Sequence, residues 1–252
     1  MVLINFVFSL YPKKQFDILL SRGMFNPEKA SHGTNKKYLR YPSENYKKLL
    51  HRNRKLYFVS EHVFLRNNYN NIISKQSANI IYRKHVLDSL TLMPFFKSFW
   101  YNKKTKTCLD FGTGGGFPGL VISIFFPEIF ISLLDSIEKK TIFHRGTLGI
   151  IRSSNCNSIC LRGERLNYSI NHLKKYDLVL SRAVANLGLL IELSKTLIKS
   201  TGMFVAMKKI RGCGKEINDT IVFPLKTDVK IKCLVKVDTK RSGKVLFIFK
   251  KF

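Results

Sequence analysis

The sequence predicts an α/β fold in which helices cover both faces of a doubly wound, mostly parallel β-sheet. From residue 107 onwards, short apolar segments of strand length alternate with longer segments that have helical periodicity. A glycine-rich turn follows the first apolar segment and leads directly into a predicted helix. Because each helix returns the chain across one face of the sheet, this alternation favours parallel strand pairing.

Each element is predicted from its apolar spacing, its length and the residues that flank it. The predicted strands of the parallel sheet are residues 107–111, 130–134, 158–161, a segment that includes 178–180, and 203–207. The predicted helices are residues 79–94, which we expect to end near the proline at 94, then 120–126, 138–151 and 187–198. Residues 229–237 and 244–249 predict an antiparallel strand pair at the C-terminus.

The chain carries a large excess of positive charge. Its 44 Lys and Arg residues against 16 Asp and Glu residues give a formal net charge of +28. Such an excess is typical of proteins that bind a polyanion, most simply nucleic acid. An anionic membrane surface, or lysines accumulated through an AT-rich genome, are the alternatives. No apolar run reaches the roughly 20 residues that span a bilayer, so we expect no membrane-spanning segment.

The cysteines predict free thiols rather than disulfides or a metal site. They are Cys108, Cys156, Cys160, Cys213 and Cys233. Their number is odd, no Cys-x-x-Cys pair occurs, and Cys156 and Cys160 lack a further partner at metal-ligand spacing. We therefore expect no bound metal ion, and we expect a monomer.

The first 60 residues differ in composition from the rest of the chain. They hold 12 Lys and Arg residues but only 3 Asp and Glu residues. This composition is typical of an organelle-targeting leader, which would place the protein in a plastid or mitochondrion; without a leader we expect a cytoplasmic location. A disordered basic arm that helps to bind RNA and a cryptic start site are the alternatives. We therefore divide the chain into an extension, residues 1–60, and a domain, residues 61–252, which begins with a helical cap.

The glycine-rich turn after the first strand is the most informative segment. Gly114, Gly116 and Gly119 satisfy the dinucleotide pattern G-x-G-x-x-G, which would suit an NAD-dependent oxidoreductase. The same turn also fits acidic-x-Gly-x-Gly-x-Gly, with Asp110 and Gly112 before Gly114 and Gly116. A carboxylate at the strand end can meet the cationic amino group of a methionine moiety, whereas it would repel a pyrophosphate. Asp110 therefore favours S-adenosylmethionine over NAD.

A second carboxylate closes the second predicted strand. Asp135 can accept hydrogen bonds from both hydroxyls of a ribose, as acidic residues at this position do in doubly wound sheets. This residue alone does not separate an adenosyl group from NAD. Together with Asp110, it predicts a Rossmann-like, class I S-adenosylmethionine-dependent methyltransferase.

The sequence resembles the RsmG family, also called glucose-inhibited division protein B. The resemblance runs from about residue 67 to the C-terminus, in the family's order. The matching pieces are Asn71, residues 83–89 (Arg-Lys-His-Val-Leu-Asp-Ser), residues 110–119, residues 133–136 with Lys139 and Lys140, residues 162–164 (Arg-Gly-Glu), Asp177 with residues 181–185 (Ser-Arg-Ala-Val-Ala), and Lys208.

The resemblance implies methyl transfer from S-adenosylmethionine to N7 of a guanine in small-subunit ribosomal RNA. The cofactor contacts that it implies are Gly112, Phe117, Asp135, Ser136, Ile137, Gly163, Glu164 and Arg182. Arg182 and Lys208, at predicted strand ends, are candidate positioning groups, and no catalytic residue is predicted. The guanidinium of Arg182 would hold either a carboxylate or an RNA phosphate. A non-catalytic RNA-binding protein that keeps this fold is the alternative from another class.

The chain departs from the family pattern at several positions. Arg165 stands where the family often has a second acid, so the adenine side of the site is expected to be more basic. Ile72 and Ile73 replace a Leu-Thr pair. Lys209 and residues 211–215 replace the family's Lys-Gly step and the loop after it. These departures concern the RNA-facing side more than the cofactor site.

Overall fold

The structure is a computed structural model of the chain, and it describes residues 44–74, 77, 81–100, 106–182, 187–209, 229–237 and 244–251. The predicted leader therefore lies largely outside the described residues, as does Cys213. The targeting role of the leader stays a prediction.

The described strands form one sheet in the order β3-β2-β1-β4-β5-β7-β6. The parallel strands are β1 (Thr107–Phe111), β2 (Phe130–Asp135), β3 (Cys156–Cys160), β4 (Tyr176–Arg182) and β5 (Ile198–Lys209). Strands β6 (Val229–Val237) and β7 (Lys244–Lys251) follow, and β7 pairs antiparallel with both β5 and β6. The strand order reverses between β1 and β4, which confirms the predicted doubly wound parallel sheet and places its ligand crevice at their carboxyl ends.

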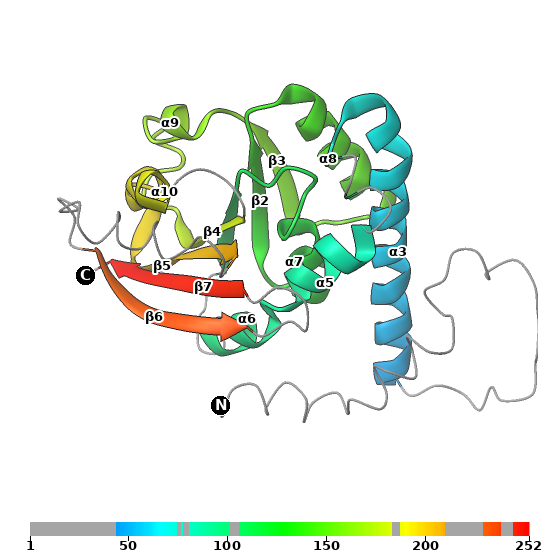
Figure 1. The fold of residues 1–252 in the computed structure, drawn as a ribbon, viewed down its shortest axis with the longest axis horizontal. Coiled ribbons are helices and arrows are strands. Elements are labelled where there is room, and N and C mark those ends of the chain that lie inside the picture. The colour runs from blue at the N-terminus through cyan, green and yellow to red at the C-terminus, as the bar shows by residue number, and fades with distance from the viewer. Residues whose placement is uncertain are drawn as a thin grey trace, which may run out of the picture.

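Helices cover both faces of the sheet (Figure 1). Helices α9 (Gly163–Leu166) and α10 (Leu187–Lys195) lie on one face. The other face carries α7 (Gly119–Phe125) and α8 (Glu138–Ile150), with a layer of further helices outside them. That outer layer, which we call the helical cap, consists of α3 (Glu44–Asn70), the π-helical turn η2 (Tyr82–Val86), α5 (Leu87–Leu90) and α6 (Met93–Trp100).

The single helix predicted over residues 79–94 is confirmed in part. Its described residues are helical through η2 and α5 as far as Leu90, but α6 begins at Met93, so Pro94 stands near the start of a further helix. Proline lacks a backbone N–H and is tolerated in the first turn of a helix, where that N–H would have no intrahelical partner. The same residue type therefore marks a helix start here, although the periodicity before it predicts a helix end.

Helix α3 shows that the folded domain begins before residue 60. It crosses the predicted boundary, and its apolar residues Leu56, Val59 and Val63 are buried in the same core as α7. The basic residues of the segment, among them Arg52, Arg54 and Lys55, directly precede these apolar positions, so the composition of the first 60 residues masks their helical spacing. The boundary predicted after residue 60 therefore falls inside α3, between residues that share one core.

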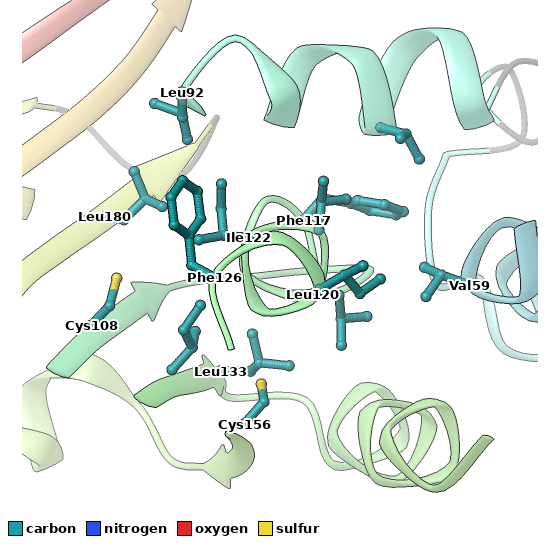
Figure 2. Close-up of a cluster of buried hydrophobic side chains, with 14 of the residues drawn as sticks. Val59, Leu92, Cys108, Phe117, Leu120, Ile122, Phe126, Leu133, Cys156 and Leu180 are labelled. Carbon is teal, nitrogen blue, oxygen red and sulfur yellow. The ribbon is translucent and has the colours of Figure 1, made fainter. Parts of the chain in front are cut away.

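The larger core lies between the cap and the sheet, with α7 at its centre (Figure 2). The side chains drawn around α7 include Val59 of α3, Leu92 in the turn between α5 and α6, and Cys108, Leu133 and Leu180 of the strands. Because α7 begins directly after the glycine-rich turn, this packing fixes the turn relative to the strand ends. None of the described helices is both long and apolar enough to cross a bilayer.

The burial of α3 leads to a stability prediction. Leu56→Ala should lower the free energy of unfolding by about 2–5 kcal/mol, because it removes a side chain that is only 1% exposed and leaves a cavity. Leu65→Ala, on the same helix at 55% exposure, is the matched control and should change stability by less than about 0.5 kcal/mol. Urea unfolding measures both. Equal effects would contradict the assignment of α3 to the domain.

Candidate functional site

The glycine-rich turn lies at the carboxyl end of β1 and adopts a conformation that needs glycine. Gly112, Gly114 and Gly116 have φ values of 69°, 61° and 86°, in the left-handed region that other residues adopt at a cost. A side chain at Gly119 would overlap Leu133 and the carboxylate of Asp110. Gly112 and Gly114 are the partly exposed residues of the turn, so a ligand at the strand end would meet backbone at these two positions.

Asp110 lies beneath this turn and is fully buried. Its Oδ2 accepts hydrogen bonds from the Thr113 hydroxyl at 2.6 Å and from the Gly119 N–H at 2.7 Å. Its Oδ1 is buried and has no hydrogen-bond partner within the described part of the chain. Burial raises the pKa of Asp110 to about 6, against the hydrogen bonds and the charge of Arg182, which lower it. One carboxylate oxygen thus holds the turn, and the other is left for a further donor.

Asp135 closes β2 and is only 6% exposed. Its Oδ2 accepts the N–H of Gly114 at 3.0 Å, and its Oδ1 accepts the N–H of Ile137 at 3.0 Å. The ammonium of Lys140 lies 3.7 Å from Oδ2. A carboxylate oxygen can accept more than one hydrogen bond, so Asp135 can fix the glycine turn and still accept ribose hydroxyls.

An open pocket of about 790 Å³ lies beyond the carboxyl ends of β2 and β3. It is lined by Ser136, Cys160, Leu161, Arg162, Glu164 and Arg165. The structure therefore brings the predicted residues Ser136 and Glu164 to one pocket. Gly163, which directly precedes Glu164, packs so closely against the ring of Phe111 that any side chain there would overlap it. Arg162 and Arg165 make this pocket more basic, as the departure at residue 165 indicates.

A second group of predicted residues lies apart from the residues that line this pocket. The guanidinium of Arg182, at the end of β4, lies 5.8 Å from the centre of the Phe117 ring. It contacts the cap at Nδ1 of His85 (2.7 Å) and Oδ2 of Asp88 (3.5 Å). Burial lowers the pKa of Arg182, and the charges of Asp88 and Asp110 oppose that shift. The Phe117 ring is buried, so it does not line the pocket described above.

His144 of α8 belongs to the site, although the sequence analysis did not select it. Its Nε2 is 2.8 Å from the carbonyl oxygen of Gly114, and its Nδ1 is 3.2 Å from the hydroxyl of Ser158. Because a carbonyl only accepts, Nε2 carries the proton. The peptide groups on either side of Gly114 are thus fixed by Asp135 and by His144. Helical spacing from the buried Thr141 and Thr147 is the sequence signal that places His144 on the inner face of α8.

Asp177 and Lys208, which also match the family motifs, lie outside these two groups of residues. Asp177 is near the amino end of β4, where its Oδ2 accepts hydrogen bonds from the Thr107 N–H at 3.0 Å and from the Lys199 ammonium at 2.9 Å. It therefore joins the starts of three strands, at the edge opposite the site. Lys208 lies in β5 and pairs with Val245 of β7.

The described residues contain no cluster of side chains that could bind a metal ion. No three His, Cys, Asp or Glu side chains there gather to hold a metal ion. Cys108 and Cys156 are buried free thiols, and Cys160 is exposed.

Comparisons with known proteins identify the family to which the chain is similar. The family model GidB, described as rRNA small subunit methyltransferase G, matches residues 52–235. A protein of that name from Lysinibacillus sphaericus is 33% identical over 174 residues, which cover 68% of this chain and 71% of that relative. One from Clostridium botulinum is 34% identical over 180 residues, covering 65% and 73%. A crystal structure of an MtNAS mutant shares the fold, with a TM-score of 0.51 at 11% identity over 82% of this chain and 77% of that one.

The buried histidine leads to a prediction about stability and pH. Burial lowers the pKa of His144 from 6.5 to about 4, so the unfolded chain binds more protons between these values. The free energy of unfolding should therefore fall as the pH falls through this window. His144→Gln keeps an amide donor for Gly114 but does not titrate. Relative to this variant, the wild type should lose about 3 kcal/mol between pH 7 and pH 4.

Urea unfolding of both proteins across this range measures the difference. The raised pKa of Asp110 acts in the opposite direction in the same window, but it is common to both proteins and cancels. A difference that does not vary with pH would show that His144 is not held neutral against Gly114.

Proposed function

Because the chain belongs to the GidB family, rRNA small subunit methyltransferase G, we propose that it transfers a methyl group from S-adenosylmethionine to N7 of a guanine in small-subunit ribosomal RNA. The family establishes methyltransferase activity on this RNA, and it implies S-adenosylmethionine as the cofactor. The choice of guanine N7 as the acceptor atom rests on the motif resemblance. The family also excludes the NAD-dependent oxidoreductase considered for the glycine turn. The observation that carries the residue assignments is the pair of buried carboxylates, Asp110 and Asp135, on either side of the turn.

The chain's residues fit the two ends of S-adenosylmethionine. At the adenosyl end, Asp135 and Ser136 adjoin the pocket that Glu164 and Arg165 line, which suits a ribose and an adenine. At the other end, Asp110 and Arg182 lie at the ends of the neighbouring strands β1 and β4. Their opposite charges suit the ammonium and carboxylate of an amino acid, and Asp110 Oδ1 is a buried acceptor without a partner in the described chain.

Arg182 suits the cofactor carboxylate better than an RNA phosphate. Its side chain is only 15% exposed and lies between the cap and the glycine turn. A buried guanidinium can pair with a carboxylate that enters the crevice, whereas a phosphate in an RNA backbone needs an accessible partner. Of the two ligands that the sequence left open for Arg182, a carboxylate or an RNA phosphate, we therefore propose the carboxylate.

Methyl transfer to guanine N7 requires the protein to align the two reactants, and it does not require the removal of a proton. When bound, S-adenosylmethionine supplies an electrophilic methyl group on a sulfonium. Guanine N7 carries a lone pair and no proton in the neutral base, so no general base is needed. Asp135 and the glycine turn fix the adenosyl end, and Arg182 and Asp110 fix the amino-acid end, so the chain's residues hold the methyl donor in one orientation. His85 accepts a hydrogen bond from Arg182 and is not assigned a proton-transfer role.

The net charge of +28 supports binding of the RNA backbone. We also propose that the protein acts as a monomer and without a metal ion. All the residues assigned above come from one chain, and an unprotonated nitrogen needs no Lewis acid to become a nucleophile. A plastid or mitochondrial location is proposed only on the composition of the leader.

The residue assignments predict ligand-specific losses of affinity. Asp135→Asn should weaken binding of both S-adenosylhomocysteine and 5′-methylthioadenosine by about tenfold, because both ligands have the ribose. Arg182→Gln should weaken only S-adenosylhomocysteine, by a similar factor, because 5′-methylthioadenosine lacks the amino-acid group. Isothermal titration calorimetry measures these constants. Asp177→Asn is the control, because it changes a carboxylate at the amino ends of the strands, opposite the site. It should lower the stability of the protein without changing either dissociation constant. Equal losses of affinity in all three variants would contradict the placement of the cofactor.

The absence of a required base predicts a flat pH profile. At saturating cofactor and RNA, the single-turnover rate of methyl transfer should vary little between about pH 6.5 and 8.5, the range in which a histidine base would still titrate. His85→Gln should lower that rate less than about tenfold, whereas loss of a general base typically costs about 10²–10⁴-fold. A rate that rises tenfold per pH unit in the wild type, and not in this variant, would point to a different acceptor atom.

A further inference from the structure

Arg182 is the point at which three parts of the fold meet. It ends β4, it lies over the ring of Phe117 in the glycine turn, and it contacts two residues of the cap. Those two residues are His85 in η2 and Asp88 in α5. The cap therefore reaches the ligand crevice through these two side chains.

The contact with His85 fixes the state of the imidazole. Every polar group of a guanidinium is a donor, so the Nη2 of Arg182 donates and Nδ1 of His85 accepts at 2.7 Å. His85 must then be neutral, with its proton on Nε2. A protonated His85 would lose this acceptor and would place a second positive charge beside Arg182.

The guanidinium of Arg182 has two further neighbours, Asp88 and Phe117. Asp88 Oδ2 lies 3.5 Å from Nη1, and the two side chains are only 18% and 15% exposed. The His85 ring stacks on Phe117 with centroids 5.1 Å apart and planes inclined by 20°. Arg182 thus uses its two terminal nitrogens on the cap and lies over the same aromatic ring. An arginine has five N–H donors, so donors remain for a ligand.

From this arrangement we infer that His85 and Asp88 are positioning residues of the cofactor site: they orient Arg182 toward the carboxylate at the amino-acid end of the cofactor. The inference rests on the proposed function and extends it to the cap. The negative charge of Asp88 also opposes the effect of burial on the pKa of Arg182. In consequence, a substitution of His85 or Asp88 weakens the binding of the amino-acid end of the cofactor and leaves the binding of the adenosyl end unchanged.

The alternative is that His85 and Asp88 only pack the cap onto the domain. Two substitutions of His85 separate these roles. His85→Asn keeps an acceptor near the position of Nδ1 but loses the ring, whereas His85→Phe keeps a ring against Phe117 but loses the acceptor. Asp88→Asn removes the charge at nearly constant volume. Arg182→Gln provides the background in which positioning can have no further effect.

The experiment measures dissociation constants of the full chain and these variants for S-adenosylhomocysteine and 5′-methylthioadenosine by calorimetry. His85→Phe and Asp88→Asn should each raise the constant for S-adenosylhomocysteine about tenfold and that for 5′-methylthioadenosine less than about threefold. His85→Asn should stay within about threefold of the wild type for both ligands. In the Arg182→Gln background, His85→Phe and Asp88→Asn should have no further effect, since the two effects share one interaction.

Several results would overturn the inference. They are equal losses for both ligands, a loss for His85→Asn as large as that for His85→Phe, or additive losses on the Arg182→Gln background. Thermal unfolding of each variant establishes that it is folded, and if His85→Phe does not fold, Asp88→Asn alone and in the Arg182→Gln background decides the question. A wild type that binds neither ligand would overturn the proposed function itself, whereas a wild type that binds both, with variants that match it, would overturn only the role of His85 and Asp88.

Discussion

The buried carboxylate of Asp110 is the interaction on which the site depends. Its Oδ2 joins the Thr113 hydroxyl in the glycine turn to the Gly119 N–H at the start of α7. Strand, turn and helix are thereby held at one atom, and the turn can keep the left-handed conformations of its glycines. Burial raises the pKa of this carboxyl to about 6, so its ionised form depends on nearby positive charge such as that of Arg182.

The turn is fixed on its other side by a charged and a neutral group. Asp135 accepts the N–H of Gly114, and His144 donates to the carbonyl of the same residue. The two contacts come from β2 and α8, so the packing of α8 on the sheet sets the shape of the ligand loop. His144 therefore acts on the ligand loop through its contact with the Gly114 carbonyl, and its burial favours the neutral imidazole.

The helical cap does more than cover the core. Leu56, Val59 and Val63 of α3 pack into the same cluster as α7, while His85 and Asp88 contact Arg182 at the strand ends. The apolar contacts hold the cap on the sheet, and the polar contacts link it to the crevice. A segment that reads as a basic extension in the sequence is thus, from α3 onwards, part of the unit that shapes the cofactor site.

The sequence by itself determined the order of the strands from β1 to β5, the helices α7, α8 and α10 between them, the glycine turn and the two carboxylates, because these depend on local periodicity and on residues adjacent along the chain. The short helix α9 (Gly163–Leu166), between β3 and β4, was not predicted. The motif resemblance added Arg182 and Glu164. Only the tertiary structure decided that Arg182 is held by His85 and Asp88, that Phe117 is buried beneath His85, and that His144 fixes Gly114. These contacts join residues 30 to 97 positions apart, and no local pattern encodes such a distance. The start of the domain was likewise decided by packing, because the apolar side of α3 is recognisable only against the surface that buries it.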